Sequence, residues 1–326
     1  MFDDYPPIPP EAAPDPREPS SETSQAEPSP QVWGEPVAGG APVSAMGTSY
    51  HDLRYPADLQ ISWSWVHLVL FLLFAVISLT AIQGVLMVIY GPHQSMSAQQ
   101  LEAYLLSKPQ FALGSMVIWY AAIFFFLYVT LSLLRGHSFW ECLGWRKISA
   151  RPGERARNPI VYFFAGCALS LIVAVLSSRL KAPDNSPMEE LFKNRQTALL
   201  FVAMAVLIAP LVEETLFRGY LYPLIARLFT SILRFVGLEE SRALRLGVAG
   251  AILMTGVLFG MMHGAQLGWT WGLVAMLILV GVVFTWVRAR TGSVFASFLM
   301  HLGYNSLISV AALIGTHGFS QSPVGK

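Results

Sequence analysis

Long apolar runs separated by short polar segments occupy the chain from about residue 56 onward. Each run approaches or exceeds the ~20 residues that a helix needs to cross the hydrocarbon layer of a membrane. The pattern therefore predicts an all-α protein, a polytopic bundle of membrane helices. The expected spans cover residues 63–90, 110–134, 158–178, 190–224, 246–266, 268–288 and 294–315.

The fourth of these runs is too long for one simple span. The chain is helix-compatible from Met188 to Val236, and a helix of that length would far exceed the bilayer at about 1.5 Å per residue. Pro210 lacks a backbone donor and clashes with the preceding turn. We expect a kink or break there, just before Glu213, which leaves the number of transmembrane helices at seven or eight.

The N-terminal region has a different composition from the rest of the chain. Residues 1–55 are rich in Pro, Glu, Ser and Ala and contain no apolar core of a signal peptide. Such a segment cannot bury enough apolar surface to offset its ordering entropy, so we predict a disordered tail. A partner-docking role is the alternative. We expect the N-terminal transmembrane spans within residues 56–185 and a short C-terminal tail at 317–326.

Composition and charge agree with a membrane protein. The chain is 54% hydrophobic and 13% charged, with a net charge of +1, whereas a soluble domain carries roughly 25% charged residues. Basic residues gather in the loop between the second and third spans, which by the positive-inside rule places that loop and the acidic tail in the cytoplasm. Basic residues form no aromatic-interleaved patch, so no nucleic-acid partner is expected. Two cysteines cannot form a disulfide framework.

Three charges within the fourth run call for an explanation. Glu213, Glu214 and Arg218 lie in PLVEETLFRGYL, and a charge at bilayer depth costs at least about 2.5–3.5 kcal/mol. In a helix, Glu214 and Arg218 are i, i+4 neighbours within reach of an ion pair. Glu213 points about 100° away, with no local partner, and is free to accept a proton from water. A buried ion pair that only locks helix packing is the alternative.

Two later spans carry further polar pairs. Phe259 and His263 are spaced i, i+4, as are His301 and Asn305. Three helices could thus bring Glu213, both histidines and Asn305 around one water molecule or one metal ion. Glu213, His263 and His301 would be the metal ligands, because carboxylate and imidazole groups are usual ligands of zinc. Without a metal, the same groups could act as base, oxyanion donor and water clamp.

Each polar group also has a structural interpretation. His263 alone would more often be a satisfied core or interfacial histidine, and His301 with Asn305 could be an interhelical hydrogen-bond clamp. Gly256 and Gly260 predict a close helix contact. The remaining histidines have no partner motif and are expected to be interfacial or solvated: His67, His93, His137 and His317.

The depth of the motifs in the membrane is a further question for a shared site. Counted from the basic loops, His263 falls near the outer end of its span and His301 nearer the inner end of its own. We expect tilted or broken spans to bring the two histidines together.

The three ordered motifs resemble those of the CPBP family (CAAX protease and bacteriocin-processing), which includes the Ras-converting CAAX endopeptidases. The resemblance covers roughly residues 190–312 and implies a catalytic membrane region over 186–316. It implies Glu213 as general base, His263 as oxyanion stabiliser or water-positioning group, and His301 with Asn305 completing the site. Glu214 and Arg218 would orient and stabilise it. CAAX enzymes have an Asn four residues after the second-motif His, where this chain has Leu267.

The sequence therefore predicts an integral-membrane endopeptidase that cleaves membrane-associated proteins or peptides, with CAAX-type processing as one form. A zinc-type cofactor is compatible with the sequence but not required by it. The alternatives are a non-catalytic scaffold or bacteriocin-immunity protein of the same family, and an ion-coupled carrier, for which the expected repeat of charges in two halves is missing. We expect a multi-pass location in a cell membrane, as in the bacterial inner membrane.

Overall fold

The structure is a computed structural model that describes residues 55–91, 97, 100, 104, 109–148, 158–180 and 195–319. Within these residues the regular secondary structure is entirely helical. The predicted tail, except for Tyr55, lies outside the described residues. His93 also lies outside them. Tyr55 is buried, with its ring under the guanidinium groups of Arg227 and Arg234. Tyr55 thus belongs to the packed region rather than to the predicted tail.

The helices follow the predicted apolar runs closely. The α-helices are α1 (Trp65–Tyr90), α3 (Pro109–Leu127), α4 (Phe139–Cys142), α5 (Ile160–Ser177), α7 (Arg195–Ala203), α8 (Ala209–Glu213), α9 (Tyr222–Phe235), α10 (Glu240–Met262), α11 (Trp271–Thr291) and α12 (Val294–Gly315). Three π-helical stretches continue them: η2 (Tyr128–Leu133), η3 (Met204–Ile208) and η4 (Glu214–Leu221). Short 3₁₀ turns are η1 (Ala57–Leu59) and η5 (Ala265–Leu267).

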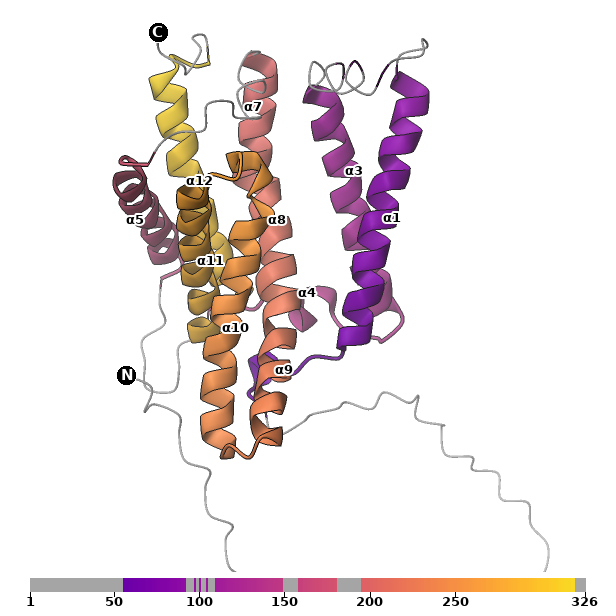
Figure 1. Cartoon of the computed structure of the whole chain (residues 1–326), viewed down its shortest axis with the longest axis vertical. Helices are drawn as coiled ribbons and strands as arrows, with labels where there is room; N and C mark the ends of the chain where they lie inside the picture. The colour runs from indigo at the N-terminus through magenta and orange to yellow at the C-terminus, as the bar shows by residue number, and fades with distance from the viewer. Residues whose placement is uncertain are drawn as a thin grey trace, which may run out of the picture. The chain divides into compact units, whose positions relative to one another are not determined.

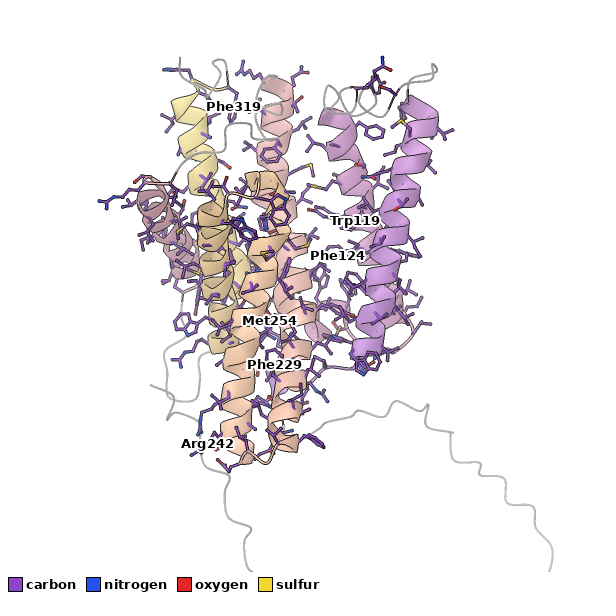
Figure 2. All side chains as sticks on the ribbon, in the orientation of Figure 1. Trp119, Phe124, Phe229, Arg242, Met254 and Phe319 are labelled. Atoms are coloured by element: carbon purple, nitrogen blue, oxygen red, sulfur yellow. The ribbon has the colours of Figure 1, made fainter. Side chains whose placement is uncertain are left out.

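Seven helical runs among the described residues are long and apolar enough to cross a membrane. Between 11% and 39% of the most apolar part of each run is buried inside the protein, so most of that apolar surface faces outward. Figure 2 shows the side chains that cover these outward faces. A helix that exposes mainly apolar side chains is stable in lipid rather than in water. The protein is therefore an integral multi-pass membrane protein, as predicted.

Pro210 does not break the fourth span. Helix continues without interruption from Arg195 to Phe235, a run of 41 residues, or about 60 Å at 1.5 Å per residue. The π-helical stretch η3 directly precedes Pro210, and Ala209 donates its N–H to Met204 O, five residues back. A wider turn of this kind accommodates the missing donor of proline without ending the helix. Among the described residues, the number of candidate transmembrane helices is therefore seven, the lower of the two numbers that we predicted.

Most of the packed helix pairs are antiparallel (Figure 1), whereas α5 and α12 run in the same direction. Helices α9 and α10 form a hairpin, α10 packs on α11, and α12 packs on both α11 and α5, while α1 pairs with α3. The α9–α10 hairpin extends beyond the nearby ends of α11 and α12 (Figure 1), and Arg242 lies at its tip (Figure 2).

Gly256 and Gly260 form the predicted close helix contact, between α10 and α11. A Cβ atom at Gly256 would lie 2.7 Å from the backbone N of Val282, and one at Gly260 would lie 2.6 Å from that of Ile278. Only glycine fits at such separations, because real Cβ atoms do not approach backbone atoms so closely. The contact sets the position of the C-terminal end of α10, which carries His263.

Candidate active site

Glu213 is the last residue of α8, and Glu214 is the first residue of the π-helical stretch η4. The carboxylate of Glu214 pairs with Arg218, as the spacing predicted: Arg218 Nη1 lies 2.9 Å from Glu214 Oε1, and both side chains are 0% exposed. Arg218 Nη2 also donates to the carbonyl oxygen of Gly281 on α11, at 3.1 Å. The ion pair thus ties the motif helix to its neighbour.

Aromatic rings enclose the guanidinium group of Arg218. Its Cζ atom lies 4.4 Å from the ring centre of Phe259 and 5.3 Å from that of Phe284. Cation–π attraction of this kind is strongest where the charge is removed from water. Rings from α10 and α11 therefore help to hold a cation that the surrounding lipid would not solvate.

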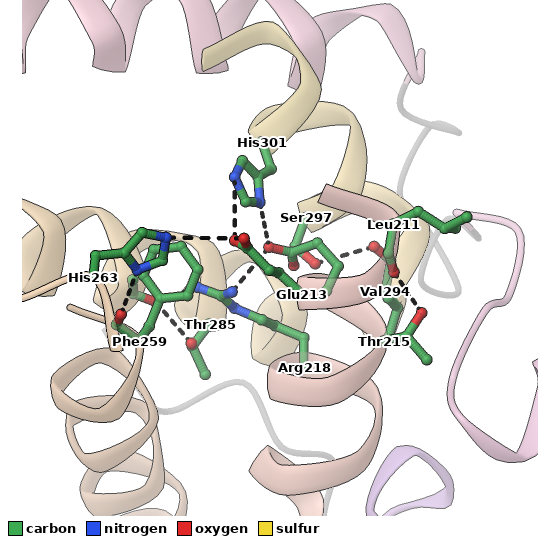
Figure 3. Close-up of polar contacts among 12 residues, drawn as sticks. Leu211, Glu213, Thr215, Arg218, Phe259, His263, Thr285, Val294, Ser297 and His301 are labelled. Atoms are coloured by element: carbon green, nitrogen blue, oxygen red, sulfur yellow. Dashed lines mark hydrogen bonds and ion pairs between the residues drawn. The ribbon is translucent and has the colours of Figure 1, made fainter. Parts of the chain in front are cut away.

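His301 contacts both glutamates, and its ring lies beside the Glu213 carboxylate in Figure 3. Its Nδ1 is 3.0 Å from Glu214 Oε1, and its Nε2 is 3.8 Å from Glu213 Oε2. Because Glu214 is paired with Arg218 as a carboxylate, Nδ1 donates to it, and the neutral ring keeps a lone pair on Nε2. The sequence suggested that Glu213 has no partner near it along the chain, and its neighbours indeed come from other helices.

His263 approaches Glu213 from the end of α10, with Nε2 3.8 Å from Glu213 Oε1. Its Nδ1 lies 2.8 Å from the carbonyl oxygen of Phe259. A carbonyl can only accept, so Nδ1 carries the proton and Nε2 of the neutral ring is an acceptor that faces Glu213. The Phe259 and His263 spacing seen in the sequence thus fixes a tautomer as well as a shared helix face.

The two histidines meet at one level of the structure, although the sequence placed them at different depths. Glu213 and His263 lie at nearly equal distances along the chain from the turn of the α9–α10 hairpin. Because this hairpin extends past the ends of α11 and α12 (Figure 1), counting from its tip places His263 too far out. The spans meet although the helix continues through Pro210, where we expected a kink or a break.

Asn305 makes its hydrogen bond elsewhere than at the two histidines. Its Nδ2 donates to the carbonyl oxygen of Ala205, at 2.7 Å. In the π-helical register of η3, this carbonyl would accept from residue 210, which is a proline and has no N–H. Among the described residues, no hydrogen bond joins Asn305 to Glu213, His263 or His301. The observed contact is the interhelical clamp that the sequence left open as an alternative.

Glu213 differs from Glu214 in its access to solvent or substrate. The Glu213 side chain is 19% exposed, as is that of His263, whereas Glu214 is fully buried. A water molecule or a peptide can therefore reach Glu213 and His263. Glu214 and Arg218 can act only through the groups that they hold.

The candidate metal ligands are spaced too widely for a closed zinc site. Glu213 lies 3.8 Å from the Nε2 atom of each histidine, whereas ligands of one tetrahedral zinc ion lie about 3.3 Å apart, because each bond is about 2.0–2.1 Å long. In the described part of the chain, no group of three or more His, Cys, Asp or Glu side chains is arranged to hold an ion. The site therefore fits a bridging water better than a bound metal.

The sequence missed several contributors to this cluster. Phe284 packs on His301, with ring centres 4.8 Å apart, and the Gly281 carbonyl accepts a hydrogen bond from Arg218. No sequence signal marks a backbone carbonyl, and Phe284 lies within an ordinary apolar run. The interpretation of His67 as interfacial or solvated is wrong: this side chain is buried and hydrogen-bonded to Tyr220 and Thr130. His137 and His317 are exposed, as expected.

Fold and site together define a class: a multi-pass membrane helix bundle with a buried Glu–Arg pair and two histidines around a partly accessible glutamate. Residues 195–307 match the family model described as Type II CAAX prenyl endopeptidase Rce1-like. The match spans about a third of the chain and contains every motif residue. The match supports the CPBP/CAAX protease family that the resemblance implied. Comparison with curated proteins and with solved structures gave no match.

Proposed function

We propose that this protein is an intramembrane endopeptidase in which Glu213 activates a water molecule for attack on a peptide carbonyl. The observation that carries the proposal is the placement of Glu213, 3.8 Å from the Nε2 atoms of both His263 and His301. The similarity of residues 195–307 to a protease family supports a peptidase in general. The role of each residue and the substrate are our inference.

Glu213 and His263, the two partly exposed acceptors of the cluster, can hold the water molecule that acts as nucleophile. A water between Glu213 Oε1 and His263 Nε2 would donate one hydrogen to each. Glu213 then takes a proton as the water oxygen bonds to the carbonyl carbon. When the peptide C–N bond breaks, this proton passes to the leaving nitrogen, which yields one acid and one amine from one peptide and one water.

His301 can assist the proton transfer without leaving its place. Its Nδ1 is held by Glu214, and Nε2 faces Glu213 as an acceptor. A proton that moves from Glu213 to Nε2 would create an imidazolium ion stabilised by the adjacent carboxylate. Arg218 keeps Glu214 ionised for this purpose. The three buried groups thus support the chemistry of one accessible carboxylate.

The substrate that we propose is a membrane-associated protein or peptide that reaches Glu213 from the bilayer. The matched family model names CAAX prenyl endopeptidases, which makes a prenylated C-terminal peptide the first candidate. This chain has Leu267 where CAAX enzymes have an Asn, which makes an unprenylated substrate a second candidate. We expect the protein to reside in a cell membrane with its N-terminal tail in the cytoplasm.

The test uses full-length protein in liposomes and two peptides that end in Cys-aliphatic-aliphatic-X, one farnesylated and one not. Wild type and Glu240→Gln should cleave at least one peptide, and Glu213→Gln should cleave neither. Glu240 is a matched control, because its carboxylate is 55% exposed at the α9–α10 hairpin.

Undiminished cleavage by Glu213→Gln would overturn the assignment. If neither peptide is cleaved, a comparison of the membrane proteomes of cells that express wild type or Glu213→Gln distinguishes a peptidase from a scaffold. Products present only with wild type support the peptidase, and identical proteomes favour the scaffold interpretation.

A further inference from the structure

A second buried polar cluster lies apart from the site described above and reaches beyond the matched region. It joins His67 on α1, Thr130 on η2 and Tyr220 on η4. His67 Nδ1 lies 2.7 Å from the hydroxyl of Tyr220, and Nε2 lies 2.9 Å from that of Thr130. The His67 and Tyr220 side chains are buried, at 7% and 1% exposure. Polar groups at such a depth are costly unless each one is paired.

The hydrogen bond that Thr130 donates to a backbone carbonyl fixes the direction of the other hydrogen bonds in this cluster. The Thr130 hydroxyl donates to the carbonyl oxygen of Phe126, at 2.8 Å, so it accepts from His67 Nε2–H. The other nitrogen of the neutral ring then accepts from the Tyr220 hydroxyl. The chain of donors thus runs from Tyr220 through His67 to Thr130, and all its polar atoms are satisfied.

Tyr220 belongs to the same π-helical stretch as Glu214 and Arg218. Arg218 points to one side, toward Gly281 and Phe259. The Tyr220 side chain instead packs against α1 and the segment before it, with its ring stacked on Trp63 at 5.3 Å. The indole N–H of Trp63 also donates to the backbone oxygen of Tyr220, at 3.2 Å. The stretch is therefore fixed from two sides.

A π-helical stretch is a rare geometry that persists only where its surroundings determine it. The turns of η4 set the direction of Glu213 and Glu214, because a return to α-helical turns would rotate the residues before Arg218 relative to those after it. Contacts that hold Tyr220 in place consequently hold the carboxylates toward His263 and His301.

We infer that His67 is a positioning residue for the active site, acting through the hydroxyl of Tyr220. It holds the register of η4, and with it the orientation of the Glu213 and Glu214 carboxylates. The inference rests on the proposed peptidase function. It extends the functional unit to α1, which lies outside residues 195–307.

The experiment measures kcat and KM for the CAAX-type peptide that wild type cleaves, together with the thermal unfolding temperature. His67→Leu and Tyr220→Phe should each lower kcat about ten-fold with KM within about two-fold, because a small misplacement of catalytic groups lowers the rate rather than binding. The double variant should be no slower than either single variant, since both remove one link. His67→Asn should restore most of kcat, because its Oδ1 can accept from Tyr220.

Thr230→Val is the control, because this buried hydroxyl donates to Ala226 O within its own helix. Wild-type kcat in both Tyr220→Phe and His67→Leu would overturn the inference. The inference would also be overturned if His67→Asn lowered kcat as much as His67→Leu does, or if the control Thr230→Val lowered kcat to the same extent. Glu213→Gln in the same series separates the two proposals: if it remains active, the peptidase function itself fails, whatever His67 does.

Discussion

His301 contacts both carboxylates of the motif helix, with Nδ1 3.0 Å from Glu214 Oε1 and Nε2 3.8 Å from Glu213 Oε2. One imidazole ring therefore connects the buried, Arg-paired glutamate to the accessible one. The adjacent residues Glu213 and Glu214 have different environments, so equal substitutions at the two positions should have different consequences.

Glu213→Gln should abolish peptide cleavage and leave the fold intact. The side chain is 19% exposed, and its ion-pair-distance neighbours in the described structure are the neutral rings of His263 and His301, so an amide fits there at little cost. Glu214→Gln should lower both activity and stability, because Arg218 would lose its carboxylate partner at 2.9 Å. Peptide hydrolysis and thermal unfolding in detergent test the difference, and equal losses of stability in the two variants would contradict it.

Arg218→Met should destabilise the protein by about 3–5 kcal/mol, because it leaves Glu214 as a buried unpaired charge. The double variant Glu214→Leu with Arg218→Met should recover much of this stability, since apolar pairs often replace buried ion pairs at no net cost. It should stay inactive, because His301 has lost the carboxylate that holds Nδ1. Unfolding in denaturant measures the first effect. Recovery of cleavage in the double variant would show that Glu214 has no part in the chemistry.

The apolar pattern predicted most of the fold, because each span in lipid must satisfy its backbone within its own helix. The boundaries of α1 and α12 agree with the predicted spans within about two residues. The continuous helix through Pro210 could not be predicted, since π-helical turns depend on neighbours such as Asn305 rather than on local propensity.

The sequence indicated most of the residues that meet at the candidate site, but not Asn305's contact with Ala205 or the arrangement of the others. Spacing indicated the Glu214–Arg218 pair, because i, i+4 neighbours touch on any helix. The contact of His301 with both glutamates depends on how α12 packs on η4, which no local pattern encodes. His67 gave no signal, because its partners Tyr220 and Thr130 are distant in sequence.

Cleavage should survive treatment with 1,10-phenanthroline or EDTA. The Nε2 atoms of both histidines lie 3.8 Å from Glu213, a spacing that suits a bridging water better than the ligands of one zinc ion. Assays before and after dialysis against chelator, with elemental analysis of the purified protein, provide the measurement. Loss of activity that added zinc restores would show that Glu213, His263 and His301 close around a metal.

Gly256→Val should lower stability and cleavage together. A Cβ atom at Gly256 would lie 2.7 Å from the backbone N of Val282, so α10 and α11 must move apart and carry His263 away from Glu213. Gly84→Ala on α1 is the control, because a Cβ atom there would meet no other helix of the described structure within 4 Å. Thermal unfolding and kcat should both fall in the first variant and neither in the second. A Gly256→Val protein with wild-type kcat would show that this contact does not set the site.

Asn305→Ala should destabilise the protein by about 1 kcal/mol, a usual value for an interhelical hydrogen bond in a membrane. The carbonyl oxygen of Ala205 would lose its donor at 2.7 Å. Pro210→Ala supplies a backbone N–H that can reach the same carbonyl in the π-helical register. In the Pro210→Ala background, the loss of Asn305 should therefore cost much less.

A double-mutant cycle of unfolding free energies between positions 210 and 305 measures this coupling. Cleavage measured on the same four proteins separates a clamp from a catalytic role for Asn305. A clamp predicts that Pro210→Ala restores activity to the Asn305→Ala protein along with its stability, because only the position of η3 depends on the hydrogen bond. Stability restored without activity would instead make Asn305 part of the active site, as the family resemblance implies.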